Sequence, residues 1–128
     1  MNYRGPDGGQ STVEFALVFP LAVVVVLASL LALLEVRDRI LVTHAARAAA
    51  RVAASTDDRS LIEAAGRSAA PQLAPERLTF EVVGERKPGS LLGVVVRYKR
   101  PLRRGFGWVL GDEEEITARL MLPAEVAE

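Results

Sequence analysis

The sequence predicts an α+β protein: a long N-terminal transmembrane helix that continues beyond the membrane and packs against a small antiparallel sheet of about three strands. Three observations predict this class. Residues 15–34 form an uncharged apolar run, residues 35–55 contain neither glycine nor proline, and three short strand-like segments follow residue 77. We therefore divide the chain into four parts: a polar N-terminal region (1–14), a transmembrane helix (15–34), a helix extension (35–55) and a small α+β domain (56–128).

The composition excludes several classes of function. The formal net charge is zero, so no overall electrostatic attraction to nucleic acid is expected. The chain has no cysteine, which rules out a disulfide framework, a zinc–thiolate site and a thiol nucleophile. Its single histidine, His44, has no motif partner and is expected to lie at a surface. No phosphate-binding loop, serine-hydrolase motif or metal cluster is present, so we expect neither enzyme activity nor a cofactor.

Residues 15–34 read FALVFPLAVVVVLASLLALL and carry no charge. At 1.5 Å per residue the run measures about 30 Å, the hydrocarbon thickness of a bilayer. The rest of the chain is too small to wrap such a helix in a soluble core. A cleaved secretory signal would have a shorter apolar run and a small-x-small site. The run therefore predicts a retained membrane anchor, in which Ser29 can hydrogen-bond within its own helix.

Two residues in and beside the run predict local features. Pro20 lacks a backbone N–H and opposes its ring to the carbonyl of Ala16, so we expect a kink or an unwound stretch between them. Glu14 stands at the edge of the run. Its carboxylate either lies among the lipid headgroups near the first helical turn or has a specific pairing role.

The basic residues around the run bear on its orientation. Arg4 alone precedes the run and Asp7 offsets it, whereas four arginines follow between residues 37 and 51. A count of these charges would place the C-terminal part in the cytoplasm.

The start of the run resembles the TadE-like family, minor pseudopilins of tight-adherence (Flp) type IV pilus systems. The family pattern is a glycine-rich leader, then Glu-Phe-Ala-Leu, a proline three residues further on and a span rich in leucine and valine. In this sequence the pattern is carried by Gly9, Glu14, Phe15, Ala16, Leu17 and Pro20, and an alanine- and arginine-rich stretch at 45–51 is also similar. The resemblance covers about residues 5–55.

This resemblance implies a role for the first 14 residues, as a leader and cleavage region. A prepilin peptidase would cut between Gly9 and Gln10 and leave Glu14 as the fifth residue of the mature chain. The Glu14 carboxylate would then pair with the free amine of a neighbouring subunit, within a helix-pairing surface that includes Phe15 and Pro20. The implied topology is single-pass, with a cytoplasmic N-terminus and an extracytoplasmic C-terminal domain, which is opposite to the charge count.

The resemblance also implies a set of partners. These are a prepilin peptidase, the major pilin and other minor pseudopilins, an inner-membrane assembly platform and the lipid bilayer, with no nucleic acid. The architecture expected of the whole chain, a long helix under a small antiparallel sheet, is pilin-like.

Beyond the span the sequence predicts a continuous helix to about residue 55, with Leu41, Ala45, Ala48 and Val52 on one face. Asp57 and Asp58 indicate the N-cap of a second helix over 59–70, which Pro71 ends. Strands are predicted over 78–83, 93–100 and 116–122, with a hairpin-like link at 84–90.

A longer loop, residues 101–111, separates the last two predicted strands and holds Phe106 and Trp108. A basic run (97–104) precedes it and an acidic run (112–115) follows it. If the flanking strands pair antiparallel, these runs face and neutralise each other. The two aromatic side chains either pack against the domain or contact a partner.

Two functions therefore fit the sequence. One is a structural subunit, a minor pseudopilin that helps to build a Tad/Flp-type pilus or a related secretion apparatus. The alternative is a membrane-tethered extracytoplasmic binding domain that uses the loop holding Phe106 and Trp108 and does not enter a filament.

Overall fold

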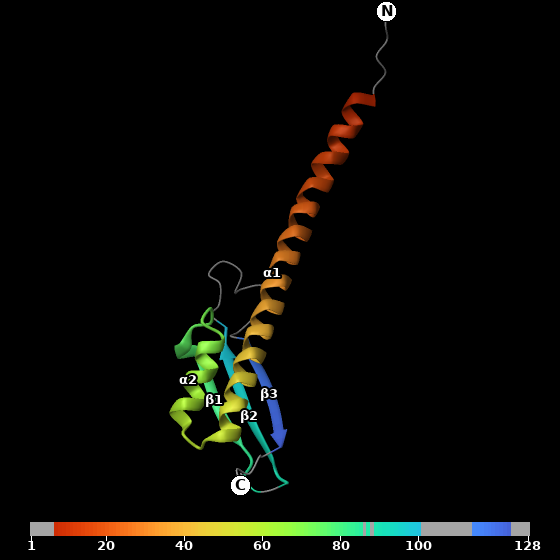
Figure 1. Ribbon diagram of the computed structural model, residues 1–128. Helices are drawn as coiled ribbons and strands as arrows, with labels where there is room; N and C mark the ends of the chain where they lie inside the picture. The colour runs from red at the N-terminus through yellow and green to blue at the C-terminus, as the bar shows by residue number, and fades with distance from the viewer. Residues whose placement is uncertain (1–6, 86, 88, 101–113, 124–128) are drawn as a thin grey trace, which may run out of the picture. The chain divides into compact units, whose positions relative to one another are not determined.

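The structure is a computed structural model that describes the backbone of residues 7–85, 87, 89–100 and 114–123, and side chains from residue 12 onward. The chain forms two compact units, Met1–Val36 and Arg37–Glu128. The elements follow the order of an α+β protein and confirm the predicted class (Figure 1). They are helix α1 (Asp7–Ser55), helix α2 (Arg59–Ala69), the 3-10 turn η1 (Pro75–Arg77), and strands β1 (Leu78–Val83), β2 (Leu91–Lys99) and β3 (Glu115–Pro123).

Helix α1 is 49 residues long and continues through Pro20, so the unwound stretch expected there does not form. Alanine, leucine and arginine are strong helix formers, and they dominate the sequence after the proline. The backbone hydrogen bonds of the neighbouring turns keep the helix intact, although proline removes one such bond. A bend of the helix axis at Pro20 stays a prediction. The Ser29 hydroxyl donates to the carbonyl of Val25 at 2.8 Å, as expected for a hydroxyl without another partner in an apolar helix.

The three strands form one antiparallel sheet in the order β1-β2-β3, so β2 is central. Phe80 of β1 lies opposite Val96 of β2, and Val96 lies opposite Ala118 of β3. The predicted strands are confirmed with small shifts of their ends, since β2 begins at Leu91, two residues earlier than expected. Because opposite residues share a face, the alternation in β1 and β3 gives one apolar face and one mostly polar face. The central strand β2 does not alternate, since residues 92–96 are all buried and Val95 lies on the polar face.

The apolar face packs against α2 and residues 37–55 of α1, which lie on the same side of the sheet (Figure 1). The predicted face of α1 is only partly right, because Ala45 is buried but Leu41 and Val52 are half-buried at its margins. The buried stripe is instead narrow and built from small side chains, which let the helix backbone approach the sheet closely. It consists of Val42, Ala45, Ala46, Ala49, Ala50 and Ala53, each 3% exposed or less.

Helix α2 begins at the predicted cap. The Asp58 carboxylate accepts hydrogen bonds from the backbone N–H of Ser60 at 2.9 Å and from its hydroxyl at 2.7 Å. These bonds favour the ionised carboxylate and lower the pKa of Asp58 below its ordinary value. Gly66 lies on the buried side of the helix, where the ring of Phe80 from β1 packs against its backbone.

We expect the substitution Gly66→Ala to destabilise the domain, although alanine is the better helix former by about 1 kcal/mol. A Cβ atom at this position would lie only 2.6 Å from Cζ of Phe80, a core residue that is 3% exposed. Overpacking of this kind costs about 1–3 kcal/mol, so the net effect is a loss. Urea denaturation of the full chain in detergent, followed through the exchange of β1 amides, measures it. Ala64→Ser, on the exposed side of α2, is the control.

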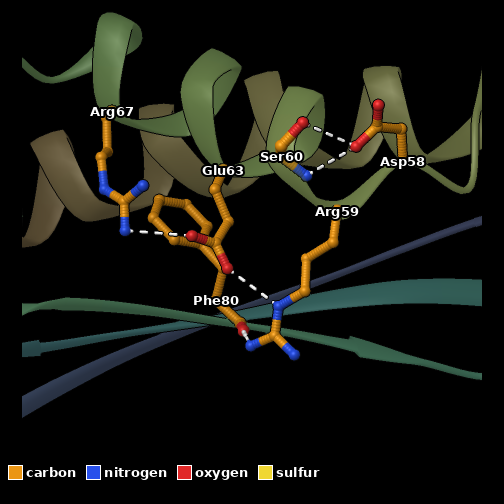
Figure 2. Close-up of polar contacts among 6 residues, drawn as sticks. All are labelled: Asp58, Arg59, Ser60, Glu63, Arg67 and Phe80. Carbon is orange, nitrogen blue, oxygen red and sulfur yellow. Dashed lines mark hydrogen bonds and ion pairs between the residues drawn. The ribbon is translucent and has the colours of Figure 1, made fainter.

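Three charged side chains of α2 join the helix to β1 (Figure 2). Glu63 accepts from Nε of Arg59 at 2.9 Å and lies 3.1 Å from Nη2 of Arg67. Arg59 also donates through Nη2 to the backbone carbonyl of Phe80 at 3.3 Å, and the Arg67 guanidinium lies over the Phe80 ring at 5.6 Å. The hydrogen bond from Arg59, and then the charge of Arg67, lower the pKa of Glu63.

The lowered pKa of Glu63 gives a pH dependence with a definite sign. Its folded pKa lies below the ordinary value of 4.5, so its stabilising contribution is complete above that value and is lost as pH falls through the folded pKa. We expect the contacts of α2 to weaken in acid below about pH 4.5, by less than about 1 kcal/mol because both arginines are partly exposed. Amide exchange of α2 at pH 7 and pH 3.5 measures this. In the Glu63→Gln variant, the difference in α2 amide exchange between the two pH values should be smaller than in the parent chain. An unchanged difference would mean that other groups cause the pH dependence.

Candidate functional site

The N-terminal part of α1 presents a continuous apolar surface. An 18-residue window of this helix has a mean hydropathy of 3.0, and none of it is buried within the chain. Large side chains are exposed all around it, with 73% of Leu17 and 64% of Leu21 accessible. A water-facing helix would carry a polar stripe, whereas this one is long and apolar enough to cross a bilayer. The helix is therefore consistent with a single-pass membrane protein.

Residues 12–34 of α1 are called the apolar rod below. Glu14 lies near its start, on the same side as Val18 and Leu21, which follow at four and seven residues along the helix. Beside this line the rings of Phe15 and Phe19 lie 5.8 Å apart with a 32° tilt. The rod thus begins with one carboxylate beside an aromatic pair, and its predicted residues Glu14, Phe15 and Pro20 fall within two turns of one another.

The other predicted site residues lie at the start of the described part of the chain or outside the described residues. The backbone of Gly9 and Gln10 is part of the first turns of α1, and their cleavage stays a prediction. Phe106 and Trp108 lie outside the described residues, so their role also stays a prediction.

A cluster of ion pairs joins α1 to the sheet just after the apolar rod. Arg100 directly follows β2. Its Nε lies 3.3 Å from Oδ2 of Asp38, without the alignment of a hydrogen bond, and its Nη1 donates to Oε2 of Glu114 at 3.3 Å. Arg39 lies 3.7 Å from the same glutamate. Asp38 and Arg100 are about 24% exposed, so this pair is less screened than a surface pair.

Sequence reasoning did not find this cluster. Asp38 stands among arginines in the sequence, and nothing in its local pattern indicates a partner 62 positions away in the chain. The cluster fixes the position of the sheet along residues 37–55. It does so because it holds the end of β2 and the start of β3 against the first turn of that segment.

The predicted neutralisation of the two charge runs is confirmed for their described members. Lys99 lies opposite Glu115 in the sheet, and Arg97 lies between Glu81 at 3.2 Å and Glu115 at 3.6 Å. The basic strand therefore faces acidic side chains of both neighbouring strands on the polar face of the sheet. The remaining members of both runs, within residues 101–113, lie outside the described residues.

Comparison with known proteins bears on the apolar rod. The model of the family described as TadE-like protein matches residues 9–51, which is 43 of the 128 residues and covers the rod, the residues before it and the alanine-rich stretch. No match was found among curated proteins or among solved structures. The match confirms the resemblance drawn from Glu14, Phe15 and Pro20, and it suggests a role in Tad pilus systems, with partners from such a system. Residues 9–51, which lie within the long helix α1, are therefore similar to the TadE-like protein family.

Proposed function

We propose that this protein is a minor pseudopilin-like structural subunit in the assembly of a Tad/Flp-type pilus or a related secretion apparatus. One observation carries the proposal: a segment similar to TadE-like proteins forms an apolar rod with exposed large side chains, and this rod begins beside a single carboxylate. A surface of this kind needs lipid or other apolar helices around it. The role is structural rather than catalytic.

Assembly would proceed through lateral packing of rods in the membrane. The N-terminus lies in the cytoplasm and the C-terminal domain outside. A prepilin peptidase removes the leader after Gly9, which gives Gln10 a free amine. Glu14 of one copy or relative then pairs with such an amine on its neighbour. At 4 Å and an effective dielectric of 20, two unit charges attract by about 4 kcal/mol.

This pairing would set the register of one rod against the next. Leaving either charge unpaired among apolar side chains is costly, so the rods avoid positions in which Glu14 has no partner. The exposed line of Val18 and Leu21 continues from Glu14 along the helix and would pack against the neighbour. Partners in this scheme are the peptidase, the major pilin, other minor pseudopilins and an inner-membrane platform.

The substitution Glu14→Ala tests the pairing role. In the native host, a tagged full-length chain carrying Glu14→Ala should co-purify with pilin-like subunits at least tenfold less than the parent chain. Glu35→Ala is the matched control, because it removes the same charge at the other end of the apolar run. Equal recovery of both variants and the parent would remove the pairing role.

Processing gives a second, independent test. Mass spectrometry of the mature N-terminus from the native host should find a chain that begins at Gln10. An intact Met1, unchanged when the prepilin peptidase is deleted, would favour a membrane-tethered binding domain over a pilus subunit.

A further inference from the structure

The two outer strands of the sheet differ in how their free edges are covered. The backbone N–H of Arg100 donates to the carbonyl of Glu114 at 3.1 Å, and in an antiparallel pair every second opposite pair makes such bonds. In this register Ala118 and Leu120 therefore bond to β2. It follows that the N–H and C=O groups of Thr117, Arg119 and Met121 point away from the sheet, along the free edge of β3.

The free edge of β1 is partly covered by the chain itself. By the same alternation, Phe80 and Val82 direct their backbone groups away from β2. The Phe80 carbonyl accepts a hydrogen bond from Arg59 (Figure 2). The N–H of Leu78 donates to the carbonyl of Pro75 in η1. Within the part of the chain that the structure describes, β2 alone hydrogen-bonds to β3, so its outer edge has no cover there. A long unprotected edge is unusual in natural proteins, since it is a template for another strand. We therefore expect the edge of β3 to pair with another strand.

We propose that the β3 edge pairs with the β1 edge of a second copy of this chain, in parallel orientation. Strands β1 and β3 are both antiparallel to β2, so they run in the same direction. Two copies side by side in the same orientation then present β3 of one to β1 of the next. Copies anchored in one membrane share an orientation, and parallel pairing keeps it.

One register satisfies both charge and backbone geometry. With Arg119 opposite Glu81 of the neighbouring copy, the N–H of Arg119 can donate to the Phe80 carbonyl and the Arg119 carbonyl can accept from the N–H of Val82. Those are the backbone groups that β1 directs outward. The polar faces then match pair by pair: Thr117 with Thr79, Arg119 with Glu81, and Met121 with Val83. Among the described residues no ion pair involves Arg119, so this charge is available for Glu81 of the neighbour.

The same register covers apolar surface that the domain leaves open. Val82 is 42% exposed and Met121 is 41% exposed, at the two edges that would meet. On the core side Leu120, half-buried at the margin of the core, would lie beside Val82 of the neighbour. The Arg59 guanidinium would leave the Phe80 carbonyl and keep Glu63, its other partner.

Antiparallel pairing of two β3 edges fits less well. Full overlap of the strands would place Arg119 opposite Arg119, and like charges directly opposite are destabilising. It would also reverse residues 37–55 of one copy relative to the other, which two copies in one membrane cannot do. Parallel edge pairing is intrinsically weak, and membrane anchoring favours it by raising the effective concentration of the neighbour. The pairing does not depend on a filament role, only on a shared membrane.

The absence of cysteine makes disulfide cross-linking a direct test. The full chain carrying Thr79→Cys and Thr117→Cys, reconstituted alone in lipid vesicles and oxidised, should form a ladder of dimers, trimers and larger products. A ladder follows because each copy offers both edges. Opposite residues of paired strands have Cα atoms about 5 Å apart, within the range of a disulfide. Thr79→Cys with Met121→Cys, four residues out of register and about 13 Å apart along the strand, is the mismatched control.

Each outcome decides the proposal. We expect the matched pair to cross-link at least tenfold faster than the mismatched pair. Adding Arg119→Glu should slow cross-linking of the matched pair several-fold, whereas adding Arg119→Lys should not. Dimers from Arg119→Cys alone would overturn the proposal in favour of antiparallel β3 pairing, in which residue 119 lies opposite itself. Equal rates for matched and mismatched pairs would overturn it in favour of random collision. Because the vesicles contain no peptidase or other pilin, these outcomes are separate from those of the Glu14→Ala test.

Discussion

Arginines in place of Val24 and Leu27 are expected to abolish stable membrane association of the full chain. Both side chains lie in the middle of the apolar rod and are 61% and 46% exposed, so neither supports the fold of the C-terminal unit. An arginine at the centre of a transmembrane helix costs about 2.5–3.5 kcal/mol for insertion, and two cost about 5–7 kcal/mol. That is a shift of more than a thousandfold from membrane to water. The fraction that stays in the membrane pellet after alkaline carbonate extraction measures it.

The controls separate insertion from a general effect of charge. Val24→Ile with Leu27→Met keeps the rod apolar and should leave the pellet fraction unchanged. Arginines at Leu61 and Ala64, both exposed on α2, add the same charge outside the rod and should also remain in the pellet. If the variant with arginines in the rod stayed in the pellet like these controls, α1 would not be the anchor.

The second large effect is expected from Ala49→Leu, in the buried stripe of α1. Ala49 is 0% exposed and belongs to the core cluster that includes Val94 and Val96 of β2. Leucine adds three carbon atoms where the helix backbone lies close to the sheet. Inserting bulk into a packed core costs about 1–3 kcal/mol, a large share of the stability of a domain this small. Exchange of β2 amides in the full chain should accelerate about 10- to 100-fold, since 1.4 kcal/mol is a factor of ten.

Ala48→Leu is the matched control, because Ala48 is the next residue of the same helix and is only half-buried. The helix propensity changes equally in the two variants, so a difference between them reports the packing alone. Similar exchange rates in both would contradict the close approach of α1 to the sheet.

Much of the fold could be predicted because its signals are local. The uncharged run at 15–34, the absence of glycine and proline after it, and the alternation in β1 and β3 each depend on neighbouring residues. The cap at Asp58 is equally local, since a carboxylate before a helix has the same role in most sequences. The start of the rod could be predicted for the same reason: Glu14, Phe15 and Pro20 lie within seven positions of the sequence.

The features that could not be predicted depend on contacts between distant residues. The buried face of α1 was placed with Leu41 and Val52 because hydrophobicity favours large side chains, whereas close packing against the sheet selects the alanines beside them. The pairing of Asp38 with Arg100, and of Arg59 with the Phe80 carbonyl, follows from tertiary geometry alone. The difference between the two sheet edges became visible only with the register of the strands.

Cysteine labelling of the full chain in spheroplasts measures most directly whether residues 12–34 lie in a bilayer with the folded domain outside the cell membrane. The parent chain has no cysteine, so Val24→Cys and Thr79→Cys each give a single reporter, both at exposed positions of the structure. With a membrane-impermeant maleimide, we predict labelling of Thr79→Cys in intact spheroplasts and labelling of Val24→Cys only after the membrane is dissolved and the protein denatured. Equal labelling of both cysteines in intact spheroplasts would place the apolar rod in water and contradict its role as a membrane anchor.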